Sequence, residues 1–99
     1  MSIQTYSIVG YLGGSLIIIS LLPQLIKIIK TKSAKDIALE TYLLLIIAEV
    51  CWIIYGFLKN DIEIIVTNIV SLFLTILITI LTIYYQKISQ ISLSEEILN

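Results

Sequence analysis

The sequence predicts an all-α membrane protein, a bundle of three transmembrane helices. The first observation is composition: of 99 residues, 59% are hydrophobic and 13% are charged, against roughly 45–50% and about 25% in soluble domains. The second is that three runs of 25, 18 and 23 residues hold one charged side chain, Glu49: Ser2–Ile26, Thr41–Leu58 and Ile64–Gln86. A helix rises about 1.5 Å per residue and the bilayer core is about 30 Å thick, so the first and third runs span it and the second just reaches.

The composition excludes several other classes of protein. A soluble domain of this size keeps much of its surface exposed and cannot bury so many apolar side chains, whereas disorder needs low hydrophobicity and high charge. The net charge of −1 does not favour nucleic acid as a partner. With one Cys and no His, we expect no intrachain disulfide, no metal and no other cofactor. A single membrane Glu makes no acid–base pair, so we do not expect an enzyme.

The first helix is expected at about residues 4–29. A signal peptide is the alternative for such a run, but Lys27 and Lys30 follow the apolar stretch instead of preceding it. Pro23, followed by Gln24, removes one backbone hydrogen bond from the helix. Two interpretations stay open: a kink that only shapes packing, or a hinge that opens and closes the cytoplasmic half.

The second helix is expected at about residues 38–58, with Glu49 near its middle. Trp52 lies three residues after Glu49 and Leu45 four before it, and Thr41 extends the same face. An ionised carboxylate is very unfavourable in lipid, so Glu49 must face protein or water, or be protonated. Trp52 is either a core aromatic or part of a binding site.

The third helix is expected at about residues 61–85, with Asn60 as its cap and Glu63 three residues later. Its polar residues recur at spacings of three and four, which places them on one face: Asn68, Ser71, Thr75, Thr79 and Thr82. We interpret the Ser and Thr hydroxyls as contacts between helices. Asn68 is costlier to bury, and we interpret it as lining a wet cavity.

Lysine placement predicts the orientation of the helices. Four of the six lysines lie in the first connection, Lys59 lies in the second, and Lys87 follows the third helix. The positive-inside rule puts the first connection and the C-terminus in the cytoplasm, and the N-terminus outside. The domain organisation is then a three-helix unit, residues 1–87, and a cytoplasmic tail, residues 88–99, which is either a short surface helix or disordered.

Self-association is expected if the membrane polar groups line a cavity. Three helices should pack into a solid triangle, which encloses no pathway. Two parallel copies would give six helices around one central cavity, and small transporters use such parallel repeats with sites near the membrane midplane. We therefore expect a parallel homodimer in the lipid bilayer.

A set of motifs covers nearly the whole chain, from about Tyr6 to Tyr85. The motifs are Pro23-Gln24, the basic connection at residues 30–37, the stretch Trp52-Ile53-Ile54-Tyr55-Gly56, the pair Lys59 and Asp61, and Asn68. Asn68 follows Trp52 by sixteen residues. With this set, the chain resembles the bacterial SemiSWEET sugar transporters of the PQ-loop (MtN3/saliva) superfamily.

The resemblance implies facilitative transport of mono- or disaccharides by alternating access in a homodimer of the bacterial inner membrane. It implies that Trp52 and Asn68 of both protomers form the central sugar site. A Trp face suits the apolar face of a sugar ring, and an amide suits its hydroxyls.

The resemblance also implies two gates. Tyr55, Lys59 and Asp61 match an extracellular gate, in which Lys59 stands where relatives often have Arg and lacks the planar fork of that side chain. On the cytoplasmic side the matching positions are the hinge pair Pro23 and Gln24, and the gate residues Thr41 and Leu45. Thr41 is smaller than the Met or Phe that relatives often carry.

Glu49 departs from the family's pattern, which is usually apolar there. It is either a proton site or a polar anchor at the dimer seam. Three functions stay open: a sugar uniporter, a proton-coupled transporter of an amino acid or other small polar solute that uses Glu49, and a non-transport membrane receptor or assembly subunit of related fold. A pH gradient that accelerates uptake identifies the second, and function that survives loss of Trp52 and Asn68 identifies the third.

Overall fold

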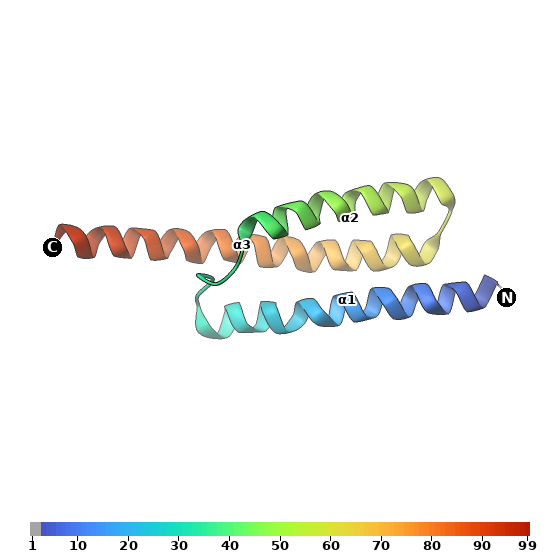
Figure 1. Cartoon of the computed structure of the whole chain (residues 1–99), viewed down its shortest axis with the longest axis horizontal. Coiled ribbons are helices and arrows are strands. Elements are labelled where there is room, and N and C mark those ends of the chain that lie inside the picture. The colour runs from blue at the N-terminus through green and yellow to red at the C-terminus, as the bar shows by residue number, and fades with distance from the viewer. Residues whose placement is uncertain (1–2) are drawn as a thin grey trace.

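The computed structural model of the protein describes residues 3–99. Within this range the chain forms three α-helices: α1 (Ile3–Thr31), α2 (Leu39–Lys59) and α3 (Ile62–Leu98). All three are long and apolar enough to cross a membrane, which confirms the predicted fold class. α1 and α3 run in the same direction, and α2 runs in the opposite one (Figure 1).

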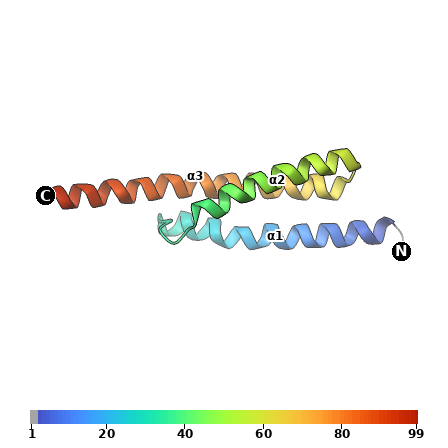
Figure 2. The same ribbon diagram turned by 45° about the horizontal axis from the view of Figure 1, so that its top comes forward.

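The three helices form a flat layer. α3 lies in the middle and packs against α1 on one side and α2 on the other, and in the described residues no Cα atoms of α1 and α2 lie within 8 Å of each other (Figures 1 and 2). The molecule measures 67 × 24 × 14 Å, so the layer is about one helix thick. The expectation of a solid triangle is therefore wrong.

Glycines allow both α1 and α2 to pack closely against α3. A Cβ atom added to Gly10 or Gly14 of α1 would meet the side chains of Glu63 or Thr67 of α3, and one added to Gly56 of α2 would meet Ile65. These positions let α1 and α2 approach α3 closely from opposite sides. The close contacts that define the layer are thus made with α3.

A small apolar core lies toward the end of the molecule that carries the α1–α2 connection. Leu21 and Ile28 of α1 are buried with Leu74 and Ile78 of α3. Side chains outside these two helices also pack against this cluster, among them Ile37 of the connection and Tyr42 of α2. Side chains from all three helices therefore meet at this end, although the backbones of α1 and α2 stay apart.

The N-cap of α3 lies one residue later than expected. Asn60 ends α2 in the left-handed conformation (φ 52°, ψ 44°), and Asp61 is the N-cap of α3, with its side chain accepting a hydrogen bond from the Ile64 N–H at 3.4 Å. The prediction that Asn60 caps the third helix is wrong. Asn adopts the left-handed conformation readily, and this leaves Asp61 extended, as an N-cap must be.

α3 continues to Leu98 and projects beyond the other two helices (Figure 1). Its 37 residues correspond to about 55 Å of helix. The expected end near residue 85 is not an end of helical structure, because no Gly or Pro follows to stop it. Of the two forms left open for the tail, the structure has a helix, continuous with α3 up to Leu98.

Candidate transport site

Five residues singled out from the sequence lie on one exposed face of α2. They are separated by four, seven, three and four positions, which is the spacing of one helical face: Thr41, Leu45, Trp52, Tyr55 and Lys59. We call this set the α2 stripe. The neighbouring face of α2, which includes Gly56, packs against α3. α2 therefore packs against α3 with one face, and the α2 stripe lies on the neighbouring, exposed face.

Trp52 and Tyr55 form the aromatic part of the α2 stripe. Their ring centroids are 5.5 Å apart with an interplanar angle of 83°, an edge-to-face pair. Trp52 is 52% exposed, so it is not a core aromatic of the single chain. Its indole is free to contact a ligand, lipid or a second copy.

Asn68 lies on α3, away from Trp52. It lines a small pocket of about 40 Å³ together with Gly14 and Ile17 of α1, and its Nδ2 donates to the carbonyl of Ile64 in its own helix at 2.8 Å. Trp52 lines a different pocket, with Cys51 and Tyr55. Within the described part of one chain, Trp52 and Asn68 therefore line two separate pockets.

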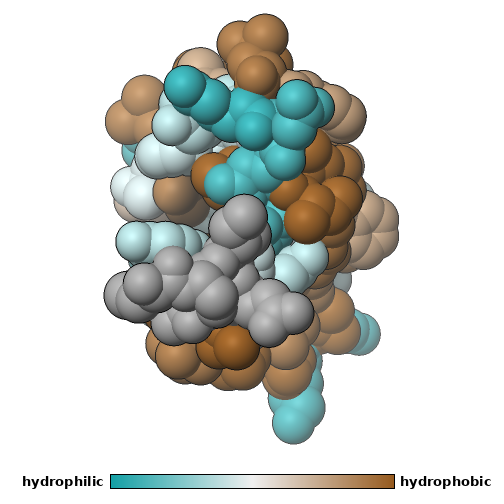
Figure 3. Space-filling view, turned by 90° about the vertical axis from the view of Figure 1, so that its right-hand side faces the viewer, coloured by the Kyte–Doolittle hydropathy of each residue, from teal (hydrophilic) through white to brown (hydrophobic). Residues whose placement is uncertain are grey.

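The residues of the candidate extracellular gate also line two different pockets within one chain. Lys59 and Asp61 both line a polar pocket of about 240 Å³ at the α2–α3 turn, which Ser7 and Glu63 also border. Figure 3 shows this end of the molecule, with hydrophilic residues gathered in its upper part and hydrophobic residues along the flanks. Tyr55 faces the pocket that contains Trp52 instead, and the Asp61 carboxylate serves as the α3 cap.

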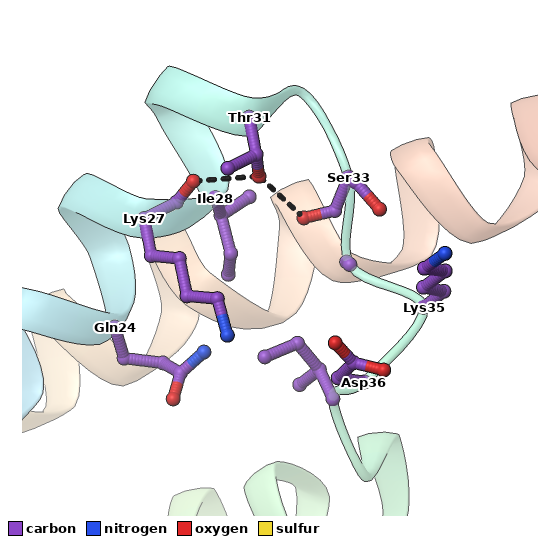
Figure 4. A pocket seen from close by; sticks show the side chains of 9 residues that line it. Gln24, Lys27, Ile28, Thr31, Ser33, Lys35 and Asp36 are labelled. Carbon is purple, nitrogen blue, oxygen red and sulfur yellow. Dashed lines mark hydrogen bonds between the residues drawn. The ribbon is translucent and has the colours of Figure 1, made fainter.

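The Pro23-Gln24 pair lies within an unbroken helix. α1 runs through Pro23, and Gln24 lines a pocket of about 260 Å³ between α1 and the α1–α2 connection. Figure 4 shows Gln24 and Lys27 of α1 on one side of this pocket and Asp36 of the connection across from them. The Thr31 hydroxyl, at the end of α1, donates to the carbonyl of Lys27 at 2.7 Å. Gln24 thus faces the connection that leads into α2.

Glu49 is buried between α2 and α3, with 7% of its surface exposed. Its Oε2 accepts hydrogen bonds from the hydroxyls of Ser71 and, at 3.1 Å, Thr75, whereas its Oε1 is buried without a hydrogen-bond partner. Of the alternatives left open for Glu49, the structure has the side chain facing protein, against α3. Periodicity places Leu45 and Trp52 on the same face of α2 as Glu49, but both remain exposed. α3 therefore covers only part of this face.

The polar face of α3 serves two purposes. Ser71 and Thr75 bind Glu49, which confirms for these two residues that the hydroxyls join helices. The Thr79 hydroxyl instead donates to the carbonyl of Thr75 within α3 at 2.7 Å, and the Thr82 hydroxyl is buried without a partner. The common spacing of these residues therefore does not imply a common role.

Gln86 has a role that the sequence analysis missed. Its Nε2 donates to the carbonyls of Ala34 and Ile37, both at 3.0 Å, and so fastens the α1–α2 connection to α3. The sequence signal that could have pointed to Gln86 is its position four residues after Thr82, where it extends the polar face of α3.

A family model described as "Sugar efflux transporter for intercellular exchange" (MtN3/saliva) matches residues 4–90. The chain belongs to this family. The MtN3/saliva family is one of transporters and not of enzymes. The match includes every candidate site residue named above.

Relatives of the chain include proteins of Leptospira biflexa and Methanocaldococcus jannaschii. The chain is 34% identical over 80 residues to a protein of Leptospira biflexa named "Sugar transporter SemiSWEET", covering 81% of this chain and 89% of that one. It is 43% identical over 77 residues to an uncharacterised protein of Methanocaldococcus jannaschii, covering 78% and 83%. The resemblance to the SemiSWEET transporters is confirmed.

Solved structures of MtN3/saliva relatives share the fold. A bacterial homologue of SWEET transporters superposes with a TM-score of 0.79 at 36% identity, covering 82% of this chain and 98% of that one. A SemiSWEET crystallised in the inward-open conformation superposes with a TM-score of 0.78 at 25% identity, covering 93% and 99%. The flat layer of three helices is therefore an arrangement that this chain shares with these relatives.

Proposed function

We propose that the protein is a facilitative transporter of mono- or disaccharides that works by alternating access as a parallel homodimer of six helices. Trp52 and Asn68 of both protomers form the central sugar site. The observation that carries the proposal is an exposed Trp52 on the α2 stripe of a chain from a sugar transporter family. The protein lies in the bacterial inner membrane with its N-terminus outside and its C-terminus in the cytoplasm, as the lysine distribution favours.

The flat layer supports a dimer. A layer about one helix thick has no wall opposite the α2 stripe, so it cannot surround a solute by itself. A second copy facing the first supplies that wall and brings Trp52 and Asn68, which line separate pockets in one chain, to a common cavity. Trp52 and Asn68 of each chain then give two aromatic faces and two amides around the sugar.

The two gates lie at opposite ends of that cavity in this proposal. Tyr55, Lys59 and Asp61 close the outer end, where the α2–α3 turn is polar. At the cytoplasmic end lie the hinge pair Pro23 and Gln24 and the gate residues Thr41 and Leu45.

Alternating access requires that one end opens while the other closes. A relative similar over 93% of this chain has been crystallised in the inward-open conformation. A proline inside α1 supplies a point at which the helix can bend. Both observations support a cycle in which the cytoplasmic half opens.

Uptake of labelled glucose and sucrose into proteoliposomes tests the proposal. We expect Trp52→Ala to reduce flux about tenfold or more, since about 1.4 kcal/mol of lost stacking corresponds to a factor of ten, and Asn68→Ala to act in the same direction. Phe57→Ala is the matched control, because Phe57 is 60% exposed on the same helix but lies outside the α2 stripe. Equal flux in Trp52→Ala and Phe57→Ala would contradict the sugar site, and no flux of either sugar in the unaltered protein would contradict the proposed substrate.

A further inference from the structure

Glu49 is buried in a part of the molecule that holds no other charge. Along α2 the nearest charged residues are Glu40 and Lys59, nine and ten positions away, and α3 has none between Glu63 and Lys87. α1, which packs on the other side of α3, has none from Ile3 to Ile26. The groups that face the carboxylate in the described chain are hydroxyls of α3. An ionised carboxylate in this setting is very unfavourable.

The two oxygens of the Glu49 carboxyl group have different surroundings. Oε2 contacts the hydroxyls of Ser71 and Thr75, whereas Oε1 is buried with no hydrogen-bond partner. An ionised carboxylate carries charge on both oxygens and needs donors at each. A protonated carboxyl group carries its polar hydrogen on one oxygen, and a carbonyl oxygen tolerates the lack of a partner better than a charge does. The surroundings therefore fit a protonated Glu49 with the hydrogen on Oε2.

Thr75 can hydrogen-bond Oε2 of Glu49 in both protonation states. Its single hydroxyl hydrogen has two acceptors within reach, the Ser71 carbonyl at 2.9 Å and Glu49 Oε2 at 3.1 Å. When Thr75 donates to the Ser71 carbonyl, its oxygen is free to accept the hydrogen of a protonated Glu49. When Glu49 is ionised, the same hydroxyl rotates and donates to Oε2. A rotation of one hydroxyl thus keeps Oε2 hydrogen-bonded in either state, whereas Oε1 lacks a donor when Glu49 is ionised.

We propose that Glu49, Ser71 and Thr75 form a proton-binding site inside each protomer, occupied when α2 is docked on α3 as in this structure. A metal cation does not fit, because the carboxylate and both hydroxyls are already in direct hydrogen-bond contact with no space for an ion between them. Loss of the proton leaves a buried charge that is relieved when α2 shifts and admits water. Trp52 lies less than one turn further along α2, so this shift moves the sugar site as well. The link to transport rests on the proposed function.

Infrared spectroscopy of the full chain in lipid vesicles tests the proton site without reference to transport. We expect a carbonyl stretching band of a protonated carboxylic acid that decreases as the pH is raised. The band should be absent in Glu49→Gln and retained in Glu40→Gln, which alters an exposed glutamate on the same helix. Identical spectra for the unaltered protein and Glu49→Gln would overturn the proposal.

A second pair of variants keeps the test valid if Glu49→Gln fails to fold. Thr75→Val removes a hydroxyl that contacts Glu49, whereas Thr79→Val removes one that binds within α3. We expect the pH midpoint of the band to shift in Thr75→Val and to stay unchanged in Thr79→Val. The same midpoint in both variants would contradict a site that includes Thr75.

Sugar counterflow at a series of pH values tests the link to transport. We expect flux in the unaltered protein and in Glu40→Gln to depend on pH, and flux in Glu49→Gln to lose that dependence. An unchanged pH profile in Glu49→Gln would overturn the coupling. A dependence on sodium concentration that Glu49→Gln abolishes would overturn the proton as the ligand. If the protein carries neither sugar, the infrared band still decides whether Glu49 binds a proton.

Discussion

α1 and α2 are held against α3 in two different ways. α1 docks by shape, with Gly10 and Gly14 opposite Glu63 and Thr67. From Tyr6 onward, the hydrogen bonds made by α1 side chains stay within α1 or reach the connection after it, and none reaches α3. α2 adds hydrogen bonds from α3 to Glu49. Apolar side chains gain little by leaving lipid for another apolar surface, so close packing and polar contacts are the means available to hold helices. α2 is thus held against α3 by hydrogen bonds as well as packing, and α1 by close packing at its glycines.

The largest effect should come from filling the space where α1 meets α3. A Cβ atom at position 14 would lie 2.3 Å from Thr67 Cγ2, whereas one at position 13 would meet nothing within 4 Å. We expect Gly14→Ala to lower the free energy of unfolding by about 1–3 kcal/mol through overpacking, and Gly13→Ala to leave it unchanged or raise it. Unfolding by denaturing detergent in mixed micelles measures both. Equal effects at the two glycines would contradict docking by shape.

An intermediate effect should come from releasing the α1–α2 connection. Gln86→Leu removes two hydrogen bonds to the connection, at about 1 kcal/mol each, and should expose it to trypsin at Lys32 and Lys35. Gln90→Leu, at an exposed position one turn further along α3, is the control. The expected result is faster cleavage in Gln86→Leu alone. Equal cleavage rates in the two variants would show that the connection is held by other contacts.

The smallest effect should come from removing one polar contact between α2 and α3. Ser71→Ala should cost about 0.6 kcal/mol and at most about 1.7 kcal/mol, the range for hydrogen bonds in membrane proteins. A double-mutant cycle with Glu49→Gln should show coupling, and a cycle of Thr79→Ala with Glu49→Gln should show none, because Thr79 binds within α3. The reverse pattern would contradict the assigned partners of Glu49.

The fold class was predictable from the sequence because membrane spans need long uncharged runs, and these are visible in the sequence. The way in which the three spans pack together was harder to predict. Periodicity shows that Leu45, Glu49 and Trp52 share a face of α2, but not that α3 covers Glu49 and leaves the other two exposed. The same limit explains the wrong expectation of a triangle, since glycine contacts decide which helices meet.

The candidate site was predictable mainly through motifs. Trp52 and Asn68 were singled out by resemblance, and one chain does not bring them into a common pocket, so their joint site remains a proposal. Gln86 was missed because its partners are backbone carbonyls 52 and 49 positions earlier in the chain. Patterns of side chains do not reveal such contacts. The role of Asn60 was misassigned because a pattern of capping residues does not show which neighbour takes the left-handed conformation.

The thinness of the layer has a consequence for how the sequence can vary. A body one helix thick has little interior, and its large side chains that are almost fully buried are Ile28, Ile78, Thr75 and Thr82. Most other apolar positions need only to be compatible with lipid, so exchange among Ile, Leu, Val and Phe should be neutral there. Relatives can then diverge widely while keeping the arrangement of helices, as in the bacterial homologue that superposes with a TM-score of 0.79 at 36% identity. In a saturation mutagenesis screen for folding, intolerant positions should concentrate on the faces of α3 that pack against α1 and α2, and at the glycines that meet them.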